Sequence, residues 1–333
     1  HDGPATSILF GSQGQRLFSS SFDHTVRVWD AETGNQLLTL TGHQDEVQSL
    51  ALSTEGTLLS GSKDGVVRRW TADRPQQFLP LRAYADGNLR VTVDQARKRL
   101  ATYGDDAPVT IWDLTTGQQL RQAMFQTARN ARAVFHDERL TVAWAQGPWG
   151  GVNQLYLQSM TDKRRSVFAE VESKVRTLDL SRDAALLACG LEDGEVQLFD
   201  IETREGKELS STMSPAVKIA FSNSVALLAV GREDGTMQWW PLTGVGSDSG
   251  ADVGTAITVK PQAINASGEI ADPDRSKEKS RDHDDQLAVV ALCFSPDESR
   301  LATAFRNGVV EVRNTKSGEL DFQRELTNAL VHR

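Results

Sequence analysis

The chain has 333 residues, of which 39% are hydrophobic and 24% charged, with a formal net charge of −9. These values are ordinary for a globular protein and exclude a wholly disordered chain, a collagen and a coiled coil. The acidic balance disfavours general nucleic-acid binding, which needs a basic surface, and no run of about 18 apolar residues suggests a transmembrane helix. We expect a cytoplasmic protein with no membrane partner and, because the sequence begins at His1 rather than Met, part of a larger chain or complex.

A sequence pattern recurs along the chain with a period of about 42 residues. Its aromatic column consists of Trp29, Trp70, Trp112, Tyr156, Phe199 and Trp240, with Arg313 in the last equivalent place. Six residues before each of these lies a second column, which is rich in aspartate: Asp23, Asp64, Asp106, Gly150, Asp193, Asp234 and Asn307. Two columns that share one spacing predict seven repeats. The distance from Trp240 to Arg313 is 73 residues, which predicts an insertion of about 31 residues in addition to one repeat.

Each repeat contains four short runs rich in β-forming residues. In the second repeat these runs are residues 47–52, 57–62, 66–70 and 77–81, with turn signals between them. Four strands in each of seven repeats predict an all-β fold, a seven-bladed β-propeller of four-stranded antiparallel blades. We expect one domain over residues 1–333, in which each blade is built from its own repeat; the blades are 1–41, 42–83, 84–124, 125–169, 170–211, 212–262 and 285–327.

The expected insertion lies within residues 243–286. Residues 272–285 are almost all charged and cannot bury a core, so we predict a mobile loop that trypsin cuts first. Residues 256–259 are the expected outer strand of the sixth blade. His283, with its aspartate neighbours, is interpreted as a solvated charge run, because adjacent ligands in a loop point in different directions. We expect no metal and no cofactor.

The repeats resemble the WD-repeat family, which is defined by an early Gly-His pair and a late Trp-Asp pair. This resemblance is carried by Gly42-His43, Trp29-Asp30 and Trp112-Asp113, and it covers nearly the whole chain. The chain also resembles the multidomain WD-repeat proteins of bacteria. The resemblance implies the propeller fold and hydrogen-bonded sets of His, Ser or Thr, Asp and Trp. The implied sets are His1, Ser19, Asp23 and Trp29 in blade 1, His43, Ser60, Asp64 and Trp70 in blade 2, and Thr102, Asp106 and Trp112 in blade 3.

These sets superficially suggest nucleophilic catalysis by a serine. The same trio recurs in successive blades, however, which a catalytic site does not need. We therefore expect the sets to stabilise the blades. No column of converging carboxylates or metal ligands appears, so a catalytic propeller is disfavoured.

The residue before each turn aspartate is expected to lie on one face of the ring. These residues are Phe22, Lys63, Asp105, Trp149, Glu192, Glu233 and Arg306. Phe22 and Trp149 are aromatic residues of the kind that anchor interfaces, unless each covers its own blade. Arg306 is expected beside Phe22 once the ring closes, so that the two offer a peptide an apolar anchor and a cation.

Three inner strands begin with a basic residue, Arg90, Arg176 and Lys218. Their blades carry Asp105, Glu192 and Glu233 at the turn, which predicts ion pairs within each blade or, if these are loose, a mixed-charge ring that selects a partner. The function expected from the sequence is a non-enzymatic scaffold that binds a protein or peptide on one face. The alternative is a sensor or regulatory module of a larger multidomain enzyme or signalling protein.

Overall fold

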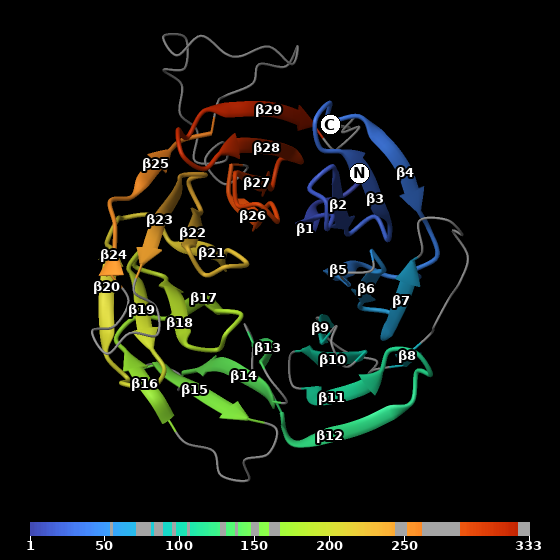
Figure 1. Ribbon diagram of the computed structural model, residues 1–333, viewed down its shortest axis with the longest axis horizontal. Helices are drawn as coiled ribbons and strands as arrows, with labels where there is room; N and C mark the ends of the chain where they lie inside the picture. Colours follow the sequence, from blue (N-terminus) through green and yellow to red (C-terminus); the bar gives the residue numbers. More distant parts are fainter. Residues whose placement is uncertain are drawn as a thin grey trace.

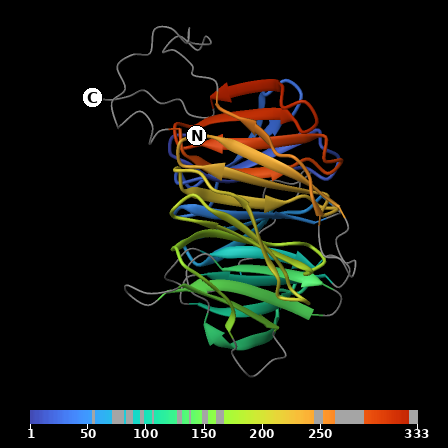
Figure 2. The same ribbon diagram turned by 90° about the vertical axis from the view of Figure 1, so that its left-hand side faces the viewer.

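Seven β-sheets form a closed ring in the computed structural model of the chain (Figure 1). The structure describes residues 1–53, 56–70, 81–82, 89–94, 98–104, 107–126, 131–136, 139–147, 153–159, 167–243, 252–261 and 287–325. Within these ranges there is no helix, and so none that could cross a membrane. Figure 2 shows the ring from its side, with the strands of neighbouring blades stacked around it.

The strands follow one another blade by blade around the ring. Blades 1 to 3 contain β1 (Ala5–Phe10), β2 (Arg16–Ser21), β3 (Val26–Asp30), β4 (Gln36–Leu40), β5 (Val47–Leu52), β6 (Leu58–Ser62), β7 (Val66–Trp70), β8 (Leu81–Arg82), β9 (Arg90–Asp94), β10 (Arg99–Gly104), β11 (Ala107–Asp113) and β12 (Gln119–Gln126). Blades 4 and 5 contain β13 (Arg132–His136), β14 (Arg139–Gln146), β15 (Asn153–Ser159), β16 (Val167–Val171), β17 (Val175–Leu180), β18 (Leu186–Leu191), β19 (Val196–Asp200) and β20 (Gly206–Ser210). Blades 6 and 7 contain β21 (Ala216–Phe221), β22 (Leu227–Arg232), β23 (Met237–Thr243), β24 (Asp252–Val253), β25 (Ile257–Val259), β26 (Val289–Phe294), β27 (Arg300–Phe305), β28 (Val309–Asn314) and β29 (Leu320–Glu325).

The predicted fold, a seven-bladed β-propeller with four antiparallel strands per blade, is confirmed. Each sheet consists of consecutive strands, so no strand is shared between the first and last blades. The sixth sheet has five strands, because β24 and β25 both pair with β23. The expected outer strand at residues 256–259 corresponds to β25. The predicted strand at residues 77–81 overlaps β8 only at Leu81, since residues 71–80 lie outside the described ranges, as does most of the predicted insertion.

The core lies between the blades, where the faces of neighbouring sheets pack on each other. Between blades 1 and 2, for example, Val26 and Val28 of β3 form one buried cluster with Leu58 and Trp70. Burying side chains of this size contributes about 1.5–3 kcal/mol each. Because β1, β5, β9, β13, β17, β21 and β26 are the innermost strands, their free edges surround the centre of the ring (Figure 1).

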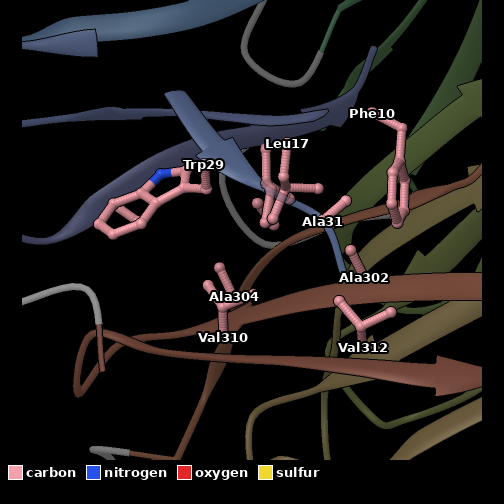
Figure 3. Close-up of a cluster of buried hydrophobic side chains, with 11 residues drawn as sticks. Phe10, Leu17, Trp29, Ala31, Ala302, Ala304, Val310 and Val312 are labelled. Carbon is pink, nitrogen blue, oxygen red and sulfur yellow. The ribbon is translucent and has the colours of Figure 1, made fainter. Parts of the chain in front are cut away.

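The ring closes by side-chain packing between blades 7 and 1. Figure 3 shows Leu17 and Trp29 of blade 1 facing Ala304, Val310 and Val312 of blade 7 in one buried cluster. The small alanines allow the two sheets to approach closely. This seam between the first and last blades therefore depends on burial of apolar surface rather than on a shared sheet.

Blade 4 departs from the predicted alignment. In every blade a leucine of the second strand pairs with an apolar residue near the end of the inner strand: Leu17, Leu58, Leu100, Leu140, Leu187, Leu228 and Leu301. In the blades with a Trp or Phe in the column, that aromatic residue pairs with this leucine, as Trp112 does with Leu100. Tyr156 instead pairs with Trp144, four residues beyond Leu140, and stacks on it with ring centroids 5.4 Å apart. The alignment of Tyr156 with the tryptophans was therefore wrong; Gly150 and Trp149, whose places were counted from Tyr156, lie outside the described residues.

Candidate functional site

The central channel opens on one side of the ring into a cavity of about 770 Å³, which we call the upper cavity. Its walls come from the beginnings of the inner strands of all seven blades, for example Thr6 of β1, Ser49 of β5 and Val290 of β26. A second cavity of about 480 Å³, the lower cavity, is lined by the ends of the same strands, such as Phe10 and Leu180. The two cavities are therefore the two ends of one channel.

The upper cavity brings together five of the residues that the sequence singled out for partner binding. Its lining includes Phe22, Arg90, Arg176, Lys218 and Arg306. Phe22 and Arg306, which come from blades 1 and 7, thus border the same space, and the Phe22 side chain is 42% exposed.

The other residues predicted for this face lie elsewhere. Among the described residues, Lys63, Glu192 and Glu233 do not line the upper cavity. Lys63 forms an ion pair with Glu46 at 3.2 Å. Asp105 and Trp149 lie outside the residues that the structure describes.

The ion pairs predicted within blades occur in one blade and fail in another. Arg176 Nη1 lies 3.2 Å from Glu192 Oε2 in the same blade, but its Nη2 also lies 3.2 Å from Glu233 Oε1 in blade 6. The predicted pair of Lys218 with Glu233 is wrong, because Arg176 reaches across the blade junction and takes this carboxylate. Within the described part of the chain, no carboxylate lies within ion-pair distance of Lys218.

The charged side chains that act on Lys218 are cations rather than carboxylates. Burial, together with the charges of Arg132 and Arg90, lowers the pKa of its ammonium group from 10.5 to about 7. These two arginines come from blades 4 and 3, so cations from three blades converge on the channel. Arg90 also donates to the backbone oxygen of Ala131 at 2.7 Å.

Arg132 is a lining residue that the sequence reasoning missed. It lies 42 residues after Arg90, which is the repeat period, and this spacing was the signal that could have found it. Its Nε lies 3.6 Å from Oδ1 of Asp179, whose other carboxylate oxygen accepts the amide of Phe221 at 3.0 Å. Burial raises the pKa of the Asp179 carboxyl above its usual range, against the effect of Arg132.

The hydrogen-bonded sets implied by the WD resemblance lie away from the channel, between the strands of blades 1 and 2. In blade 2, His43 Nδ1 lies 2.8 Å from Asp64 and Nε2 lies 2.7 Å from Ser60 Oγ, which also accepts the Trp70 indole N–H at 2.8 Å. Blade 1 repeats the arrangement. His1 Nδ1 lies 2.9 Å from Asp23 and Nε2 lies 2.7 Å from Ser19 Oγ, which also accepts the Trp29 indole N–H at 2.8 Å.

The environment of the blade 2 set favours a neutral imidazole and a charged carboxylate. Burial lowers the pKa of His43. Burial alone would raise the pKa of Asp64, but hydrogen bonds from the Gln44 amide and His43 outweigh it, so its pKa is lowered. Ser60 and Ser19 are both 0% exposed, so no substrate reaches either hydroxyl, and this geometry does not support nucleophilic catalysis.

The sets become incomplete around the ring. In blade 3 the Trp112 indole donates to Thr102 at 2.9 Å, while Asp106 lies outside the described residues. In blades 5 and 6, Asp193 and Asp234 are exposed and each accepts a backbone amide of its own turn.

Two buried arginines stabilise blades 6 and 7, and neither role was predicted. Arg232, 1% exposed, donates to the backbone oxygens of Gly194 and Ser214 at 2.8 Å and so joins blades 5 and 6. Arg313 occupies the aromatic position of blade 7 and pairs with Glu311 at 2.7 Å, with the two side chains 6% and 0% exposed. Among the described residues, no group of three or more His, Cys, Asp or Glu side chains could hold a metal ion, and the segment around His283 lies outside them.

Residues 1–30, 34–71 and 276–314 match the family described as WD domain, G-beta repeat. These three stretches are WD repeats, and they form part of a ring of seven β-sheet blades.

Parts of the chain are also similar to known proteins. The chain is 41% identical over 57 residues to the guanine nucleotide-binding protein subunit beta of Schizosaccharomyces pombe, covering 17% of this chain and 18% of the relative. It is 55% identical over 44 residues to coronin-7 of Mus musculus, covering 13% and 5% of the two chains. It is 26% identical over 224 residues to a WD repeat-containing protein of S. pombe, covering 63% and 60%. The chain thus spans less than two thirds of the length of each of these relatives.

Proposed function

We propose that this propeller is a non-enzymatic interaction module that holds a protein or peptide partner on the face around the upper cavity. The observation that carries the proposal is the position of Phe22, an aromatic side chain 42% exposed at the edge of a large cavity that is also lined by Arg306. Exposed aromatic and arginine side chains beside a concave surface are the residues that most often dominate binding energy at interfaces.

The relatives support an interaction role. One of them is named as a subunit, and a subunit functions within an assembly. The enclosed serines of the hydrogen-bonded sets also favour a structural rather than a chemical role for the polar residues between the strands.

Comparing binding and stability in two variants tests this proposal. Phe22→Ala and Arg306→Ala should each weaken a captured partner by about 1–3 kcal/mol, or roughly 5- to 150-fold in Kd, and leave the melting temperature nearly unchanged. Leu38→Ala and Arg121→Ala are matched controls, because both side chains are exposed on outer strands away from the cavity.

Partner capture from cell extract, followed by titration of the purified partner, gives the two affinities. Full affinity in both variants would place the partner on another surface. A lower melting temperature of Phe22→Ala with unchanged affinity would instead show that Phe22 covers its own blade.

A further inference from the structure

The upper cavity has a charge opposite to that of the chain as a whole. Five cationic side chains line it, and none of its lining residues in the described part of the chain is acidic, although the chain carries a net charge of −9. The cationic residues are Arg90, Arg132, Arg176, Lys218 and Arg306. A concave site with low-dielectric walls and one sign of charge concentrates ions of the opposite sign.

Three of these cations occupy the same structural position in their blades. Arg90, Arg132 and Lys218 each pair with the third residue after the second-strand leucine, namely Tyr103, Ala143 and Gly231. In the other four blades this position holds a small residue: Ser7, Ser49, Thr177 and Ala291. Of these four, Ser7 and Ser49 line the upper cavity together with the long basic side chains, whereas Thr177 and Ala291 are buried.

Among the residues that the structure describes, carboxylates lie at ion-pair distance from two of these cations. Arg176 pairs with Glu192 and Glu233, and Arg132 lies near Asp179. Lys218 has no such partner among the described residues, and the charges that shift its pKa are those of Arg132 and Arg90. A partly buried ammonium group that faces two guanidinium groups is unfavourable unless an anion compensates it.

We propose that the upper cavity binds an oxyanion with two or more negative charges, such as a phosphate group, between Lys218, Arg90 and Arg132. Guanidinium groups present planar pairs of donors that match phosphate oxygens, and the lysine adds a point charge. The anion is either a free phosphorylated molecule or a phosphate carried by the protein partner; the second case rests on the proposed function.

Titration with inorganic pyrophosphate tests the site directly. Calorimetry should show one site per chain, weakened about tenfold or more in Lys218→Met and retained in Lys218→Arg. Lys207→Met is the matched control, because it removes one positive charge from the exposed outer strand β20. Thermal unfolding of each variant shows that it is folded. No binding by the wild-type protein, or an equal loss in the control, would overturn the proposal.

The pH dependence of sulfate binding gives a second test, because sulfate keeps its charge between about pH 6 and pH 8.5. Affinity should increase as the pH falls through the Lys218 pKa of about 7, since the ammonium form then predominates. Arg90, Arg132, Arg176 and Arg306 remain charged throughout. The described carboxylates that pair with lining arginines are Asp179, Glu192 and Glu233, and of these only Asp179 has a raised pKa. Lys218→Arg should lose this pH dependence; a dependence that persists would assign it to Asp179 and overturn the role of Lys218.

Comparing a phosphopeptide with pyrophosphate separates the two sources of the anion. A phosphoserine peptide with flanking leucines that binds more tightly than pyrophosphate, and loses this gain in Phe22→Ala, supports a phosphate carried by a partner. Pyrophosphate binding without such a gain supports a free anion. If partner capture depends on Phe22 but no anion binds, this inference is overturned and the proposed function stands. If an anion binds but partner capture does not depend on Phe22, the proposed function is overturned and this inference stands.

Discussion

At the scale of single residues, aspartates at the same turn position contribute differently to stability, according to the donors that they accept. Asp64 of blade 2 accepts the His43 ring N–H at 2.8 Å and the amides of Gln44 and Val66 at 2.9 Å. Asp234 holds the corresponding turn position in blade 6, yet it is exposed and accepts the Thr236 amide at 2.9 Å. A buried carboxylate that satisfies three donors contributes more to stability than an exposed one in a turn.

Replacing Asp64 with Ala should therefore lower the free energy of unfolding by about 1–3 kcal/mol, because the donors of His43 and two amides lose their acceptor. Asp234→Ala is the matched control and should cost less than about 1 kcal/mol. Chemical denaturation of both variants measures the difference. Equal losses would show that the His43 set contributes no more than an ordinary turn.

Lys218 is the opposite case, a residue whose position opposes stability. Its pKa in the folded chain, about 7, lies below the 10.5 of a free lysine. Folding therefore favours the neutral amine, and this contribution is full above pH 10.5 and is lost as the pH falls toward 7. At and below neutral pH the folded chain must hold a charged ammonium group against two arginines.

Lys218→Met should consequently raise the free energy of unfolding by about 1–2 kcal/mol near pH 6, with a gain that shrinks as the pH rises toward 10. Melting curves of the wild-type and variant chains at several pH values check both the sign and the trend. A variant that is less stable than the wild type at pH 6 would contradict this account of the channel.

At the scale of the blade, the buried arginines of blades 6 and 7 compensate for the missing histidine–tryptophan sets. Arg313 occupies the position that Trp29 holds in blade 1 and donates to Glu311 and to the Gly318 backbone oxygen at 3.1 Å. Thr303, which corresponds to Ser19, is buried, and its hydroxyl has no hydrogen-bond partner among the described residues. The ion pair thus replaces an aromatic side chain without restoring the full hydrogen-bond network.

Removing one member of this pair should be more harmful than removing both. Glu311→Leu leaves the buried Arg313 charge without its carboxylate and should cost about 3–5 kcal/mol, whereas the double variant Glu311→Leu/Arg313→Met should recover much of that loss. A double-mutant cycle by denaturant unfolding measures the coupling. Additive losses would show that the two charges do not depend on each other.

At the scale of the whole molecule, the ring has seven junctions between blades, and the described part of the chain does not cross the one between blades 7 and 1, the seam. Arg300 of blade 7 reinforces this seam: it donates to the backbone oxygens of Gly14 and Ala31 at 2.7 and 3.2 Å and lies over the Phe10 ring at 5.3 Å. Arg99 of blade 3 occupies the equivalent place and lies over Phe135 of blade 4 at 5.1 Å. The same type of contact therefore occurs with and without a covalent connection between the blades.

In the variant Arg300→Met the seam should open more easily. The free energy of unfolding should fall by about 1–3 kcal/mol, and hydrogen exchange in β2 and β27 should become faster. Arg99→Met removes the analogous contact at a junction crossed by the chain and should leave exchange in β2 and β27 unchanged. Mass spectrometry of exchanged peptides distinguishes the two variants. Uniformly faster exchange around the ring in Arg300→Met would show that the seam does not open separately.

The sequence predicted the fold because its repeat columns correspond to paired positions in the sheets. Where the aromatic column contained a substitute, at Tyr156, the alignment slipped by four residues, although a leucine column that includes Leu140 marks the true register. Arg132 lies eight residues before Leu140, whereas Arg90 lies ten residues before Leu100, because the inner hairpin of blade 4 is shorter than that of blade 3. Phe22 and Arg306 border the same cavity, and their contact with a partner stays a prediction. The partner of Glu233 could not be predicted, because arginine side chains reach across blade junctions and a repeat pattern describes one blade at a time.

The position of the seam has a consequence for partner binding. Phe22 belongs to blade 1 and Arg306 to blade 7, so a ligand that contacts both spans the one junction that the described part of the chain does not cross. Such a ligand binds the closed ring more tightly than the open one, because opening the seam separates Phe22 from Arg306. By thermodynamic linkage, occupancy and closure then favour each other, and mechanical or thermal opening of this gap would release the ligand without any change in its own chemistry.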